Sequence, residues 1–177
     1  MSVVINGSAG VTTNSGAVYD GIQSATAQAS TSGTSIDFTG IPSWVKRITV
    51  MFSGVSTNGS SNLLVQIGTS GGVDNTGYLG SCTAATTGVS TVSFTTGFGI
   101  SVATTAAALL NGTIFLNLMD VSTNKWASSN ATGLSSSAQT HYGGGSKSLS
   151  NVLDRVRITT VNGTDTFDAG SINILYE

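Results

Sequence analysis

Charged side chains are scarce in this chain. They make up 8% of its 177 residues, against roughly 25% in an ordinary soluble domain, and the net charge is −2. The six Lys and Arg residues are too scattered to form a nucleic-acid-binding surface. Serine, threonine and glycine contribute 27, 26 and 23 residues, so hydroxyls and backbone cover most of the surface. Little charge means little repulsion between copies, and we expect the chain to associate.

Cysteine and histidine occur once each. One cysteine excludes a disulfide within the chain and a cysteine metal cluster, and we expect Cys82 to be a buried, unreactive thiol. The eight acidic residues are dispersed, with no pair placed to act across a glycosidic bond. No GxxxxGK[ST] phosphate-loop pattern is present. The sequence therefore predicts no enzyme activity, no cofactor and no metal.

Two acidic residues near the C-terminus leave two interpretations open. Asp165 and Asp168 follow Asn162 closely, and their oxygens would either join a calcium site or cap a turn. Calcium takes six to eight oxygen ligands, and no dense Asp/Asn/Gly loop surrounds these residues. This composition favours turn capping.

Long apolar runs are also missing. None approaches the roughly 20 residues of a membrane-spanning helix, and the N-terminus shows no basic stretch followed by an apolar one. Hydrophobic residues still make up 39% of the chain, with a mean hydropathy of +0.23, which is too apolar for a disordered chain. We expect a folded, soluble protein that is made in the cytoplasm.

Residues 1–33 differ in composition from the rest. After Val3, Val4, Ile5 and a turn at Asn6-Gly7, the segment is small and hydroxyl-rich, with few apolar residues. It cannot bury enough surface to fold alone. We expect an extended arm over residues 1–33 that serves attachment or oligomerisation, with a flexible linker as the alternative, and one domain over 34–177.

From residue 34 onward, polar and apolar residues alternate in short segments separated by turns. The most hydrophobic segment, 113–119, predicts the central core strand, and 103–110 is the only helix-compatible stretch. Asn162-Gly163 predicts a β-hairpin over 156–167, and we expect 143–146 to be a loop. Many short strands without helical periodicity indicate an all-β fold, a β-sandwich of jelly-roll type, with a barrel as the alternative.

Several aromatic residues flank polar segments. Trp126 and the pair His141-Tyr142 lie beside Ser-, Asn- and Gly-rich stretches. Because aromatic rings stack on the apolar faces of sugars while polar side chains bind their hydroxyls, these three are candidate glycan-binding residues. The alternative is that the tryptophans seal the ends of the sandwich.

Residues 35–68, SIDFTGIPSWVKRITVMFSGVSTNGSSNLLVQIG, resemble a module of bacteriophage and prophage tail-associated proteins, and 40–58 carry most of the likeness. The ending GTDTFDAGSINILYE fits the same module, and the opening VVINGSAGVTT resembles the start of phage tail-fibre proteins. The resemblance implies a virion component, either a short tail fibre or its receptor-binding domain. Such proteins are usually homotrimers, and some bind host cell-surface glycans. The resemblance carries over no catalytic residue.

The expected function is host attachment by a virion structural protein of tail-fibre type. The composition boundary near Gly33 and the resemblance support it. Its expected partners are further copies of itself, other tail or capsid proteins and a host glycan, without nucleic acid or membrane insertion. The alternative is a capsid decoration or head-fibre protein that binds no receptor. A capsule depolymerase is the third and least favoured hypothesis.

Overall fold

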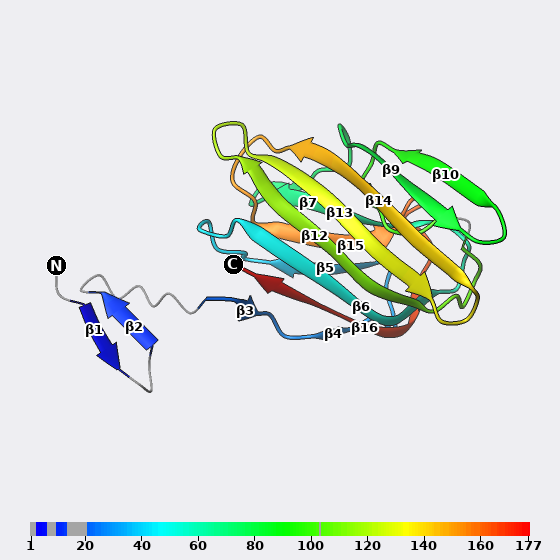
Figure 1. Ribbon diagram of the computed structural model, residues 1–177, viewed down its shortest axis with the longest axis horizontal. Coiled ribbons are helices and arrows are strands. Elements are labelled where there is room, and N and C mark those ends of the chain that lie inside the picture. The colour runs from blue at the N-terminus through cyan, green and yellow to red at the C-terminus, as the bar shows by residue number, and fades with distance from the viewer. Residues whose placement is uncertain (1–2, 7–9, 14–20, 103) are drawn as a thin grey trace.

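The computed structural model describes residues 3–6, 10–13, 21–102 and 104–177, and before residue 21 it describes the backbone alone. The strands form two antiparallel sheets and a separate two-stranded pair (Figure 1). This pair consists of β1 (Val3–Asn6) and β2 (Gly10–Thr13), and Figure 1 shows it apart from the two sheets.

The larger sheet has nine strands. Neighbours follow the order β10-β9-β14-β13-β12-β6-β16-β3, and β4 also pairs with β16. The strands are β3 (Gln23–Ser24), β4 (Gln28–Ala29), β6 (Arg47–Thr57), β9 (Leu79–Ala85), β10 (Val89–Phe94), β12 (Leu110–Asp120), β13 (Lys125–Leu134), β14 (Gln139–Ser148) and β16 (Phe167–Tyr176).

The smaller sheet has five strands in the order β11-β7-β15-β5, with β8 paired to β7. The strands are β5 (Ser35–Thr39), β7 (Leu63–Thr69), β8 (Gly72–Val73), β11 (Phe98–Gly99) and β15 (Arg155–Thr160). On the far side of β7, a second and smaller apolar cluster joins Leu64 to Cys82 of β9 and Phe94 of β10. The strands β9, β10 and β14 of the larger sheet also contact β11, so this sheet curls over that edge of the smaller one.

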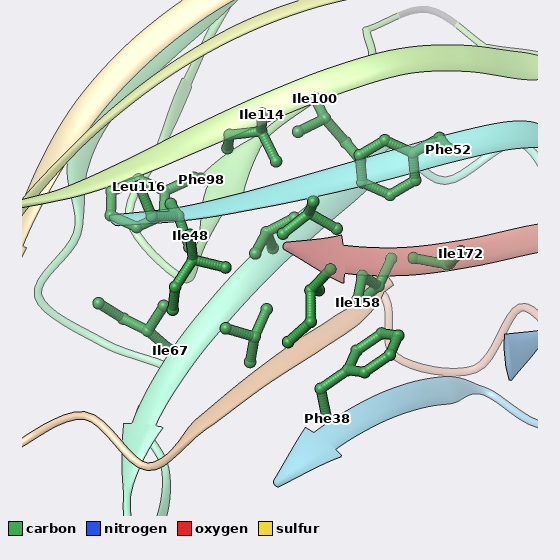
Figure 2. Packing of buried hydrophobic residues seen from close by; sticks show 14 of the residues in the cluster. Phe38, Ile48, Phe52, Ile67, Phe98, Ile100, Ile114, Leu116, Ile158 and Ile172 are labelled. Carbon is green, nitrogen blue, oxygen red and sulfur yellow. The ribbon is translucent and has the colours of Figure 1, made fainter. Parts of the chain in front are cut away.

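The main core lies between the two sheets. Alternate side chains of each strand point into it because successive residues of a strand face opposite sides. Ile48 and Ile114 of the larger sheet and Phe38 and Ile158 of the smaller one belong to a single buried cluster (Figure 2). The prediction of an all-β sandwich is confirmed.

The chain changes sheet at successive strands. It passes from β4 to β5, β6 and β7 by alternating between the two sheets, and it does so again from β14 through β15 to β16. The jelly-roll form stays a prediction, which this alternation favours.

The segment 113–119 is confirmed as a central strand. It lies within β12, between β13 and β6, where Ile114 and Leu116 are fully buried. The helix-compatible stretch 103–110 forms no helix in the part that the structure describes, and Leu110 already begins β12.

The hairpin predicted over 156–167 is wrong. β15 pairs with β5 and β7 in the smaller sheet, whereas β16 pairs with β6 in the larger one. Asn162-Gly163 is instead the corner at which the chain crosses between sheets. Only Gly163 has a positive φ there, of 67°, whereas the type I′ turn of a tight hairpin needs positive φ at both central residues.

The loop predicted over 143–146 is also wrong, since Gly143, Gly144 and Gly145 lie in the middle of β14 and pair with both β13 and β9. A Cβ at Gly143 would lie 2.5 Å from the Ser81 carbonyl oxygen, and one at Gly145 would lie 2.7 Å from that of Leu79. These glycines therefore permit a close approach of backbones rather than a flexible turn.

Pairing with the sandwich begins at Gln23, before the expected boundary at residue 33. β3 and β4 pair with β16, and the Ser30 amide donates to the Gly170 carbonyl at 2.9 Å. Residues 23–30 are thus part of the larger sheet, and only the residues before them remain candidates for an arm.

Candidate functional site

The outer face of the larger sheet presents many small, uncharged side chains. Burial alternates along β12, where Ile114 and Leu116 are fully buried and Phe115 between them is 41% exposed. Residues that are partners across neighbouring strands face the same side of the sheet, so the outward residues of β13, β14 and β9 follow from their pairing with β12 and with one another. In the middle of four neighbouring strands the outward residues are uncharged: Thr113, Phe115 and Asn117 of β12, Ala127, Ser129 and Ala131 of β13, Tyr142, Gly144 and Ser146 of β14, and Leu79, Ser81 and Thr83 of β9. Lys125 at the start of β13 and Arg47 at the start of β6 also face outward, at the end of the sheet away from Ala131.

A shallow groove, widely open to solvent and about 630 Å³ in volume, lies on this face where β12 begins and β13 ends. Its residues are small or uncharged: Asn111, Gly112, Ala131, Thr132, Gly133, Leu134, Ser135 and Thr140. Gly112 has a φ of 126°, and a Cβ at this position would collide with the Ala131 carbonyl oxygen. The floor of the groove therefore depends on glycine at residue 112.

The polar groups of the groove are partly held in place. The Asn111 amide nitrogen donates to the Leu109 carbonyl and to the Ser135 hydroxyl, both at 3.2 Å. The Asn111 amide oxygen accepts from the Gly54 backbone at 2.8 Å. This amide is fixed before any ligand arrives, and Ser135 and Thr140 add hydroxyls that donate or accept.

Tyr142 borders the groove on the outer face. It is 52% exposed, and its neighbours across the strands are Ala131 and Thr83. Ala131 lines the groove, as does Thr140 two residues earlier in β14. Because these neighbours are small, the phenol ring has an open face. A half-exposed ring beside fixed polar groups and hydroxyls is suited to stacking on an uncharged, hydroxyl-rich ligand.

Trp126 and His141 do not share this surface. Trp126 is 2% exposed and His141 is 0% exposed, and both lie on the inward side of their strands. Neither has a face on which a sugar could stack, so only Tyr142 remains from the candidate set. The sequence analysis did not predict the burial of Trp126 and His141. It took the neighbouring Ser-, Asn- and Gly-rich segments for exposed loops, whereas they are parts of β13 and β14.

The Trp126 ring lies at the end of the sandwich that contains Val45 and Leu153, beside Leu118, its partner across the strands. This placement agrees with the alternative interpretation that a tryptophan seals an end of the sandwich. The exposed Trp44 packs against Tyr176, with ring centroids 6.0 Å apart.

His141 holds the inner side of β14 against the segment that follows β11. Its Nε2 lies 3.1 Å from the Val102 carbonyl oxygen and 3.0 Å from the Gln139 amide nitrogen. Its Nδ1 has no hydrogen-bond partner in the part of the chain that the structure describes. Burial lowers the pKa of His141, because the charged imidazolium would lose its hydration.

A second buried polar group anchors the segment between β7 and β9. Lys147 forms an ion pair with Asp74 at 2.9 Å and lies 5.5 Å from the centre of the Tyr78 ring. The Tyr78 hydroxyl accepts from the Ile67 amide at 2.8 Å. Burial raises the pKa of Tyr78, so its hydroxyl stays protonated. These contacts fix the fold around residues 67–78.

Carboxylates in the described ranges are mostly paired with basic residues or used in turns. Asp37 pairs with Arg157, Asp154 with Arg155 and Glu177 with Arg47. Among the described residues, no group of three His, Cys, Asp or Glu side chains is placed to hold a metal ion. Burial raises the pKa of the free thiol of Cys82, the buried residue that we expected.

The interpretation that polar side chains near the C-terminus cap a turn is confirmed for Asn162 and Asp165. The Asn162 side-chain oxygen accepts from the backbone amides of Thr164 at 3.1 Å and Asp165 at 3.2 Å. The Asp165 carboxylate accepts from the Ser61 amide at 2.9 Å. The Asp168 carboxylate accepts from the Ser56 hydroxyl.

No family model, no curated protein and no solved structure matches this chain. Among the described residues, no helix has the length and apolar character needed to cross a membrane.

Proposed function

We propose that this chain is a non-enzymatic structural protein of a bacteriophage particle, of tail-fibre type, that mediates attachment to the host cell. The observation that carries the proposal is the uncharged groove on the outer face, bordered by Tyr142 and equipped with a fixed amide and hydroxyls. The resemblance of residues 35–68 to tail-associated proteins supports the same assignment.

The ligand of this groove is an uncharged cell-surface glycan. A sugar offers an apolar face to the Tyr142 ring and hydroxyls to Asn111, Ser135 and Thr140. The residues that line the groove carry no charge that would select an ionic ligand. The protein acts as a homo-oligomer, of which a homotrimer is the form implied by the resemblance, and its low charge supports close packing of copies.

Adsorption to host cells tests the proposal. Tyr142→Ala removes the exposed ring and is expected to reduce adsorption at least tenfold while the protein stays folded. Val161→Ala is the control, because Val161 is another exposed apolar residue, outside the groove. Equal adsorption of both variants and the parent protein would show that the groove is not the attachment site.

A capsid decoration or head-fibre protein is the second candidate. The same outer face favours it, because a wide surface of small, uncharged side chains also suits packing against a capsid. Immunogold labelling of intact particles separates the two locations. Label on the tail supports attachment, whereas label on the head alone supports decoration.

A further inference from the structure

One edge of the smaller sheet is open. β5 is its last strand and pairs with β15 alone. The Gln28 side chain donates to the Asp37 carbonyl at 2.7 Å from the side opposite β15. Because backbone groups alternate in direction along a strand, the N–H and C=O groups of Ser35 and Thr39 point to that side as well. An open strand edge is a template for pairing with another strand.

β5 carries few of the features that block strand addition, although it is only five residues long and the Gln28 side chain occupies its edge at Asp37. It contains no lysine and no proline, and its register with β15 runs without a bulge. Its one charged residue, Asp37, is held by Arg157 through two hydrogen bonds of 2.7 Å. Natural edge strands usually use lysine, proline or bulges to avoid unwanted pairing, so the lack of these three features in β5 favours addition of a further strand beside Ser35 and Thr39.

A cavity of about 300 Å³ lies beside this edge, between β5, β16 and the segment 25–28. Apolar side chains of Phe38, Ile41 and Ile174 contribute to its wall. A strand added to β5 would direct alternate side chains toward this cavity. The cavity adjoins β5 and not β10, an edge strand of the larger sheet, since no residue of β10 lines it.

The same chain holds strands that need a partner. β1 and β2 pair with each other over four residues, from Val3↔Thr13 to Asn6↔Gly10, and their contacts in the described structure are mainly with one another. An isolated two-stranded hairpin is at best marginally stable in water. Their sequences, VVIN and GVTT, contain no charge and no proline.

We propose that the β1–β2 hairpin of a second copy of this chain adds to the open edge of β5 and covers the adjacent cavity. Backbone hydrogen bonds supply the affinity and the cavity selects aliphatic side chains of the added strand. The inference rests on the self-association included in the proposed function and names the surfaces that join the copies.

The test compares full-length variants by mass in solution. Val4→Pro/Thr12→Pro disrupts both strands of the hairpin, and the exchange Val4→Thr/Thr12→Val is its matched control, because Val4 and Thr12 are partners in the register. At the acceptor edge, Thr39→Pro removes an outward-facing N–H, and Thr39→Ala keeps it. We expect an oligomer for the parent protein and both controls, and a 17.8 kDa single chain for both proline variants.

Amide hydrogen exchange gives a second readout, for which only the β1–β2 hairpin is mutated and the two sheets keep their sequence. The outward amides of Ser35 and Thr39 are expected to exchange at least tenfold faster in Val4→Pro/Thr12→Pro than in the parent protein, while those of β10 stay unchanged. A monomeric parent protein would overturn both this inference and the self-association. An oligomer that keeps its mass and its exchange rates in the hairpin variant would overturn the inference alone.

Discussion

Trp126 and Tyr142 show how the strand face decides what an aromatic residue can do. Trp126 points inward from β13 and is 2% exposed, whereas Tyr142 points outward from β14 and is 52% exposed. The indole Nε1 of Trp126 has no hydrogen-bond partner among the described residues, so the ring contributes through apolar packing. The same residue class therefore stabilises the fold at one position and is available for a ligand at the other.

This difference predicts opposite effects of alanine at the two positions. Trp126→Ala should lower the free energy of unfolding by about 3–5 kcal/mol, because it leaves a cavity at the end of the sandwich. Tyr142→Ala should change it by less than about 1 kcal/mol, as expected of an exposed side chain. Urea denaturation of both variants measures this, and equal losses would contradict the assignment of faces.

The buried His141 predicts a dependence of stability on pH. Its pKa in the folded protein is lowered by burial, whereas the unfolded chain has the ordinary value of about 6.5. Below about pH 6.5 the histidine of the unfolded chain binds a proton, whereas the buried His141 of the folded protein stays neutral until the pH is lower. Stability is therefore fully present above about pH 6.5 and falls at lower pH, by up to about 1.4 kcal/mol per pH unit.

Thermal unfolding between pH 7.5 and pH 5 tests this prediction. The chain has one histidine, so the variant His141→Gln should lose most of the decrease in Tm across this range. Asp120 does not interfere, because its pKa is lowered by hydrogen bonds from Ser122 and Thr123 and it titrates in more acidic solution. An equal decrease in the parent protein and the variant would exclude His141 as the cause.

At the scale of elements, the corner between β15 and β16 shows what local sequence leaves open. Asn162-Gly163 correctly indicated a turn, since the Gly163 amide donates to the Thr160 carbonyl at 3.1 Å. It did not indicate which strands the turn joins. Alternation along β15 and β16 defines a buried face for each strand, and both sheets of a sandwich offer such a face. Pairing with β5 or with β6 depends on residues more than 100 positions away.

The Asn162 side chain is expected to stabilise this corner. Its oxygen accepts from the Thr160 hydroxyl at 2.8 Å and from two backbone amides, and its nitrogen donates to Asp165 at 2.6 Å. Asn162→Ala should reduce the free energy of unfolding by about 1–3 kcal/mol, because these groups lose their partner. Asn162→Asp keeps the acceptor and serves as a comparison, which should also be destabilised by repulsion from Asp165. An unchanged denaturation midpoint in Asn162→Ala would refute this role.

The glycines of β14 provide the second prediction at this scale. Gly143→Ala places a methyl group 2.5 Å from the Ser81 carbonyl oxygen and should destabilise the protein by about 1–3 kcal/mol. Gly133→Ala is the matched control, because the nearest atom to its Cβ is the Gln139 carbonyl oxygen at 3.7 Å. Differential scanning calorimetry should show a lower Tm for the first variant alone. Similar Tm values for the two would contradict the close packing of β9 and β14.

For the whole molecule, the fold class followed from the sequence and the groove did not. Alternating residues predicted the sandwich, because burial of one face per strand is a local property. The groove is built around Gly112, Ala131 and Gly133, whose contribution is the absence of a large side chain. They come together only through the register of β12 and β13, with Gly112 beside Thr132 and Asn111 beside Gly133. Of the aromatic candidates, Tyr142 is exposed and stays a prediction, whereas Trp126 is buried, because the residue type alone does not show which face of a strand a ring occupies.

The scarcity of charge predicts how self-association responds to salt. Charged residues make up 8% of the chain, and the strands β1 and β2 contain none. The one charged residue of β5, Asp37, is already paired with Arg157 of the same chain. At 1 M salt the screening length is about 3 Å, so assemblies held by ion pairs weaken strongly. Association through backbone hydrogen bonds and apolar side chains should change by less than about threefold between 0.05 and 1 M NaCl, and ammonium sulfate should strengthen it. Sedimentation velocity over this range measures the dissociation constant, and dissociation into single chains at 1 M NaCl would show that ion pairs hold the copies together.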